Sequence, residues 1–139
     1  MATTARAREF FSPLPLFAVV LLVLNDHVFK AAFHNALTGK VSDFAGCFFL
    51  PLFVSALLSY VPRLGDEVKL RVLIGCVATL GLFVPIKLSA AAGLLVCAVL
   101  QHVSIPLGIG ALHIVADPTD LFAVPMVALS ALYAWKVTR

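Results

Sequence analysis

The sequence predicts an all-α fold, in which a polytopic bundle of transmembrane helices forms a single domain over residues 1–139. Hydrophobic residues make up 62% of the chain and mean hydropathy is +1.07, whereas soluble domains are about 45–50% apolar. Only 12% of the residues are charged, and many of these lie inside or at one end of long apolar runs. Because a spanning helix needs about 20 residues, the chain has room for four or five spans and almost no soluble domain.

The first two predicted spans are Leu14–Phe33 and Phe44–Val61. Pro15 opens the first span at a position where a missing backbone N–H does no harm. No small-residue cleavage site follows the early apolar run, so we interpret it as an uncleaved span and not as a signal peptide. The residues from His34 to Asp43 form a predicted polar connection, in which Gly39 supplies a turn and a side chain at its end caps the second span.

The third and last predicted spans are Leu70–Ile86 and Leu121–Trp135. A hydrophilic loop, Arg63–Lys69, precedes the third span, which ends at Lys87, whose long stem can carry its ammonium toward the membrane surface. The last span ends in aromatic and basic residues, which are typical of a membrane interface.

The apolar segment 88–116 is long enough to cross the membrane, but Pro106, Gly108 and Gly110 would interrupt a helix in its second half. If the segment does not cross, seven of the ten basic residues share one side, which the positive-inside rule makes cytoplasmic. These seven are Arg6, Arg8, Arg63, Lys69, Arg71, Lys136 and Arg139. We therefore predict four spans plus a broken re-entrant or interfacial helical segment in the inner (plasma) membrane, with both termini cytoplasmic. Five spans are the alternative.

Polar residues converge on the opposite side of the four-span arrangement and form a candidate polar site. Its members are Asp26, His27, Lys30, His34, Lys40, Asp43, Lys87, Asp117 and Asp120. Charges in apolar segments usually pair, face the interior of a bundle and mark functional sites. The four-residue spacing of Asp26, Lys30 and His34 places them on one helical face, where an ion pair and a titratable histidine are expected.

Structural interpretations compete with each part of this site. Ser42 or Asp43 can cap the second span, and Asp117, Pro118 and Asp120 together resemble a helix start. The Thr-Gly-Lys stretch lacks the remaining residues of a phosphate-binding loop. No spacing of a metal site or of a catalytic group is present, and no cofactor is assigned. The three cysteines lie in apolar stretches without paired spacing, so we interpret them as small core residues.

Four segments resemble those of a group of small bacterial membrane proteins of uncharacterised activity. The segments are Leu24–Lys30, Leu37–Gly46, Lys87–Ser89 and Asp117–Leu121. The Thr-Gly-Lys-x-Ser-Asp and Asp-Pro-Thr-Asp-Leu blocks within them are the most distinctive. The resemblance implies a multi-span inner-membrane protein and carries no catalytic role with it.

Three functional hypotheses follow. The favoured one is a non-catalytic subunit or docking component of a membrane complex, whose partners are the lipid bilayer and another membrane protein or further copies of itself. The second is an ion- or proton-responsive component with a buried Asp, Lys and His cluster. The third is a membrane-embedded enzyme acting on a lipid or isoprenoid headgroup. Nucleic acid is not an expected partner, because the basic residues are dispersed and form no patch.

Overall fold

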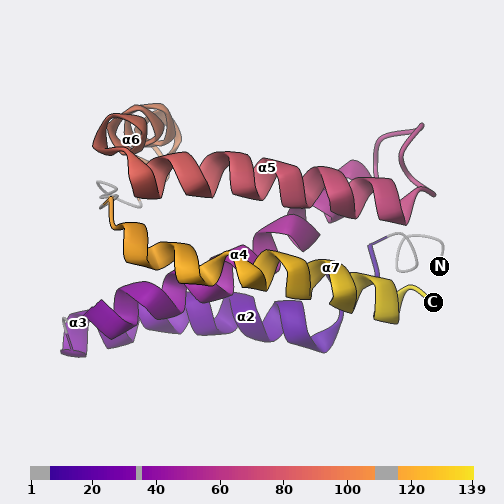
Figure 1. Cartoon of the computed structure of the whole chain (residues 1–139), viewed down its shortest axis with the longest axis horizontal. Helices are drawn as coiled ribbons and strands as arrows, with labels where there is room; N and C mark the ends of the chain where they lie inside the picture. Colours follow the sequence, from indigo (N-terminus) through magenta and orange to yellow (C-terminus); the bar gives the residue numbers. More distant parts are fainter. Residues whose placement is uncertain (1–6, 34–35, 109–115) are drawn as a thin grey trace. The chain divides into compact units, whose positions relative to one another are not determined.

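The computed structural model describes residues 7–33, 36–108 and 116–139, and every regular element in these ranges is helical (Figure 1). The all-α prediction is therefore confirmed for the described residues. Contacts divide the chain into two compact units, of which the first holds Met1–Leu80 and Ala123–Arg139 and the second Gly81–Phe122. The single domain over residues 1–139 stays a prediction.

Helical structure runs without a gap from Pro13 to Phe33, over the length of the first predicted span. It comprises the α-helix α2 (Pro13–Leu24), the π-helix η1 (Asn25–Phe29) and the α-helix α3 (Lys30–Phe33). Ser12 precedes α2 in an extended conformation. Proline is tolerated in the first turn of α2, because the first backbone N–H groups of a helix have no acceptor within the helix. Each hydrogen bond of a π-helix encloses one more residue than that of an α-helix. The side chains of η1 consequently point in other directions than they would if the α-helix α2 continued through these residues.

The helix α4 (Ala36–Leu58) begins well before the predicted second span. Gly39–Asp43 therefore lies inside a helix, and both the predicted polar connection and the predicted cap at Ser42 or Asp43 are wrong. The Ser42 hydroxyl instead bonds to residues of η1. A helix satisfies its own backbone groups where an open loop in an apolar environment would not, so helical extension wins over the local turn signals.

The helices α4 and α5 (Val68–Leu88) approach each other at Pro51 and Gly75. Pro51 stands inside α4 without ending it. A Cβ atom added to Gly75 would overlap the carbonyl oxygen of Pro51. The two backbones are thus in contact at this point, as small residues permit between membrane helices.

The segment 88–116 contains the helix α6 (Ala90–Ser104), which Ser89 separates from α5. Ser89 is extended, and its hydroxyl accepts a hydrogen bond from the Ala92 amide at 3.3 Å. The helix ends before Pro106, and Gly108 has a φ of 72°, a conformation that favours glycine. The predicted interruption at Pro106 and Gly108 is thus confirmed, whereas Gly110 lies outside the described residues.

The last helical region consists of the 3-10 helix η2 (Pro118–Ala123) and the helix α7 (Pro125–Val137). It starts a few residues before the predicted last span. By length and composition, three helical stretches of the described residues are suited to cross a membrane: Gly39–Leu58, Val68–Leu88 and Pro118–Val137. Pro13–Phe29 and Ala90–Ser104 are shorter apolar helices.

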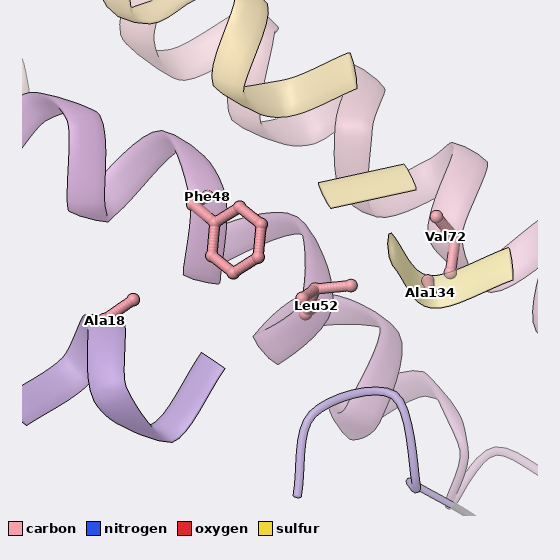
Figure 2. Packing of buried hydrophobic residues seen from close by; sticks show 5 residues of the cluster. All are labelled: Ala18, Phe48, Leu52, Val72 and Ala134. Carbon is pink, nitrogen blue, oxygen red and sulfur yellow. The ribbon is translucent and has the colours of Figure 1, made fainter. Parts of the chain in front are cut away.

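The core of the first unit lies where α4 packs against α2 and α7 (Figure 1). It is formed by Ala18, Phe48, Leu52, Val72 and Ala134, which come from α2, α4, α5 and α7 (Figure 2). Many larger apolar side chains point outward instead: Leu94 on α6 is 72% exposed and Phe122 is 75% exposed. An exposed apolar surface of this extent is typical of a protein that interacts with lipid.

We expect the substitution Gly75→Ala to destabilise the protein by roughly 1–3 kcal/mol, the usual cost of overpacking, because the new methyl group would displace the Pro51 carbonyl. Reversible unfolding in detergent micelles measures this cost. Gly81→Ala is the matched control in the same helix, since a Cβ atom at Gly81 meets nothing within 4 Å. It should stabilise by about 0.5–1 kcal/mol through helix propensity. Equal effects of the two substitutions would contradict the close approach.

Candidate functional site

The first polar group of the described residues joins η1 to α4. Asn25 is buried, and its amide donates a hydrogen bond to the Ser42 hydroxyl at 2.6 Å. That hydroxyl donates in turn to Asp26 Oδ1 at 2.7 Å. The chain from Asn25 through Ser42 to Asp26 lies where the α2 helix widens into the π-helix, a feature that is frequent at functional sites. These two bonds hold the polar part of α4 against η1.

The remaining candidates of this region are placed less completely. His27 is exposed on η1, whereas Lys40 and Asp43 are half-buried on α4. Asp26 is exposed on η1. The side chain of Lys30 and the residue His34 lie outside the described parts, so the predicted pairing of Asp26 with Lys30 stays a prediction.

An ion pair joins Lys87 to Asp120 in the second unit, with Nζ 2.8 Å from Oδ2. Both side chains are only 11% exposed. The ammonium also lies 5.6 Å from the centre of the Phe83 ring, one turn earlier on α5. The predicted proximity of Lys87 to the Asp117–Asp120 turn is thus found. The Thr38–Asp43 stretch belongs to the first unit, and its place in a shared pocket stays a prediction.

Asp117 caps the start of η2, as the helix-start interpretation expects. Its Oδ1 accepts hydrogen bonds from the Thr119 amide at 3.0 Å and from the Thr119 hydroxyl at 2.7 Å. The Asp117 carbonyl accepts the amide of Asp120 at 3.0 Å. This turn therefore presents the Asp120 carboxylate to Lys87.

The most buried charged groups form a cluster that the sequence did not predict as a site. Glu9 and Arg71 are each 1% exposed, and Arg71 Nη2 lies 3.0 Å from Glu9 Oε1. The Ser55 hydroxyl donates to the same oxygen at 2.7 Å, and Arg71 Nη1 donates to the Gly65 carbonyl. The cluster joins the N-terminal segment to α4, to the loop after α4 and to α5.

A second set of contacts holds the same end of the first unit. The Tyr133 hydroxyl donates to the Ser12 hydroxyl at 2.9 Å, and that hydroxyl donates to the Glu9 carbonyl at 3.1 Å. On the neighbouring surface, the Lys69 ammonium lies 5.3 Å from the centre of the Trp135 ring. The end of α7 is thus tied to the N-terminal segment and lies beside the start of α5.

Sequence reasoning treated Arg71 only as one of several topology signals and did not single out Glu9. Their charges are complementary, but 62 residues separate them, and no local spacing connects them. One signal was available, since Glu9 is the only acidic residue before Asp26. An acid beside an apolar run favours a basic partner, but Arg6 and Arg8 precede it directly and are nearer candidates by sequence than Arg71.

Metal and thiol chemistry find little support among the described residues. No group of three or more His, Cys, Asp or Glu side chains there is arranged to hold a metal ion. His102 bonds through Nδ1 to the Ala98 carbonyl at 2.8 Å, and His113 lies outside the described residues. Cys47 and Cys97 are buried and Cys76 is half-buried, in agreement with the interpretation of the cysteines as small core residues.

We expect the Glu9→Gln and Arg71→Met variants each to lose roughly 3–5 kcal/mol of stability, the usual cost of breaking a buried ion pair from one side. The Glu9→Gln/Arg71→Met double variant should lose less than the sum of the two single losses, because no unpaired charge remains buried. Unfolding in detergent provides the measurement. Arg63→Gln, at an exposed position of the same loop, is the control and should change stability by less than about 0.5 kcal/mol. Additive single effects would contradict the pairing.

A second double-mutant cycle addresses Lys87 and Asp120. We expect Lys87→Met and Asp120→Asn to show a coupling energy of about 0.5–3 kcal/mol, the range for residues in direct contact. Thermal unfolding of the two single variants and the double variant gives this quantity. Lys136→Met, at an exposed position on α7, combined with Asp120→Asn should show no coupling. A cycle without coupling at Lys87 would mean that the ion pair contributes nothing in the membrane.

Comparisons of the chain with protein-family models, with curated proteins and with solved structures gave no match. The resemblance to small bacterial membrane proteins therefore stays a prediction.

Proposed function

We propose that the chain is a four-span protein of the inner (plasma) membrane with both termini in the cytoplasm. The helical stretch from Pro13 to Phe33 is the fourth span beside the three long helices, and α6 does not cross. Contacts at one end of the first unit support this topology. They tie the N-terminal segment to the start of α5 through Glu9 and Arg71, and to the end of α7 through Ser12 and Tyr133. Termini on one side require an even number of crossings.

The proposed biochemical role is that of a non-catalytic subunit or docking component of a membrane complex. One observation carries it: two pairs of ionisable groups in or beside the apolar segments are bonded to each other. Glu9 pairs with Arg71, and Lys87 pairs with Asp120. Such pairs hold helices in position relative to one another. The exposed apolar faces are then the surfaces that contact lipid and partner proteins.

A second candidate function has an observation of its own. The hydrogen-bonded chain of Asn25, Ser42 and Asp26 lies at a π-helix with His27 exposed beside it. A carboxylate and a histidine at such a position favour an ion- or proton-responsive component. The enzyme hypothesis receives the least support, because Asp117 caps η2 and Asp120 binds Lys87.

Reporter fusions test the topology. We expect fusions at Arg139 and in the Arg63–Lys69 loop both to report the cytoplasm, because the basic residues of these regions favour that side. A fusion near Ser89, between α5 and α6, should report the opposite side and is the internal control. A C-terminus on the periplasmic side would contradict four spans.

Native mass spectrometry of the protein extracted in a mild detergent tests the subunit role. We expect a complex of constant stoichiometry, formed with further copies of the chain or with another membrane protein. A monomer alone would overturn the subunit role and favour the ion-responsive alternative.

A further inference from the structure

A groove of about 770 Å³ lies between the first turns of α5 and the last turns of α7, within the first unit. Its floor is apolar and is formed by Val72, Cys76, Ala131 and Ala134. Ligand sites typically measure about 300–1,000 Å³, so the groove has the size of one. Both helices are among those suited to cross a membrane. In the proposed membrane-spanning arrangement of these helices, the floor faces the hydrocarbon region and the charged end of the groove lies at the helix termini.

The mouth of the groove carries charges of both signs. Asp66 and Glu67 precede α5, and Lys69 and Arg139 lie beside them on the lining. All four residues are exposed. The Lys69 ammonium and the Arg139 guanidinium lie 5.3 Å and 5.8 Å from the centre of the Trp135 ring. Tryptophan of this kind is typical of the headgroup level of a membrane, so the charges stand where lipid headgroups are.

We propose that this groove binds a glycerophospholipid whose headgroup carries a primary ammonium. The acyl chain lies on the apolar floor, the phosphate meets Lys69 and Arg139, and the ammonium meets Asp66 and Glu67. The two positive and two negative side chains of the mouth match a headgroup that is itself zwitterionic. This binding site goes beyond the proposed subunit role and does not depend on which side of the membrane the termini occupy.

Charge complementarity selects this headgroup over others. A glycerol headgroup offers the same phosphate to Lys69 and Arg139 but has no ammonium to pair with Asp66 and Glu67, so the two carboxylates face a net negative ligand. A trimethylated ammonium has no N–H to donate to Asp66 or Glu67, whereas a primary ammonium has three. A helix of a second copy is the less fitting occupant, because it would cover four exposed charges that now contact water.

The single tryptophan of the chain provides the measurement, because Trp135 lines the groove. Delipidated protein is titrated with lipids that share brominated acyl chains and differ in headgroup: ethanolamine, choline or glycerol. Bromine quenches a neighbouring indole. We expect the ethanolamine lipid to quench Trp135 at a concentration roughly fivefold lower than the other two, the ratio that an exposed ion pair at its upper limit produces. Soluble glycerophosphoethanolamine should not displace it, because it lacks the chain that fills the floor.

Two sets of variants test the headgroup contacts and the acyl-chain floor separately. Asp66→Asn combined with Glu67→Gln should remove the preference for ethanolamine over choline and leave quenching by both. Ala131→Phe should weaken quenching by every lipid, because it fills the floor. Arg63→Gln is the matched charge control, since Arg63 is exposed in the same loop and does not line the groove. Leu132→Phe is the control on the outer surface of α7.

Two results would overturn the proposal, because each would mean that only annular lipid surrounds Trp135. One is equal quenching by the three headgroups. The other is an ethanolamine preference that the Asp66/Glu67 variant does not change. A dimer whose formation excludes the brominated lipid would also overturn it, in favour of a second copy in the groove. A periplasmic C-terminus would overturn the proposed topology and leave the headgroup preference intact.

Discussion

An ionised side chain that leaves water for an apolar environment loses several kcal/mol of hydration, which only a well-placed partner returns. This constraint organises the described part of the chain more than any other. Glu9 and Arg71 satisfy it at one end of the first unit, where Ser55 and the Gly65 carbonyl share the remaining hydrogen bonds. One hydrogen-bond donor of the pair stays unsatisfied, because Arg71 Nε is buried and has no partner among the described residues. The pair therefore fixes position more than it adds stability.

The helix contacts of the first unit follow from where its polar groups meet. Asn25 and Ser42 join η1 to α4, while Glu9 and Tyr133 bring the N-terminal segment to α5 and α7. Between these two polar ends the helices meet through small or apolar residues, such as the contact of Gly75 with Pro51. Directional bonds at the ends and close packing in the middle together determine how these helices align.

The sequence predicted the helices more accurately than the contacts between them. The predicted spans Leu70–Ile86 and Leu121–Trp135 fall inside the helical stretches Val68–Leu88 and Pro118–Val137, because an apolar run of sufficient length has few other structures available in lipid. The start of α4 was misplaced because Gly39 and Ser42 carry local turn signals, which the hydrogen bonds of Ser42 to Asn25 and Asp26 override. The proximity of Lys87 to Asp120 followed from topology. The Glu9–Arg71 pair did not, since a partner 62 residues away leaves no periodic signal.

The order in which the chain is made gives the Glu9–Arg71 pair a role in biogenesis. At about 5–20 residues per second, Arg71 leaves the ribosome roughly 3 to 12 seconds after Glu9. During that interval α2 and α4 are already available for insertion, and Glu9 remains in water without its partner. Tyr133, which holds Ser12, arrives later still. The contacts of Glu9 and Ser12 can therefore be complete only after α7 has been synthesised.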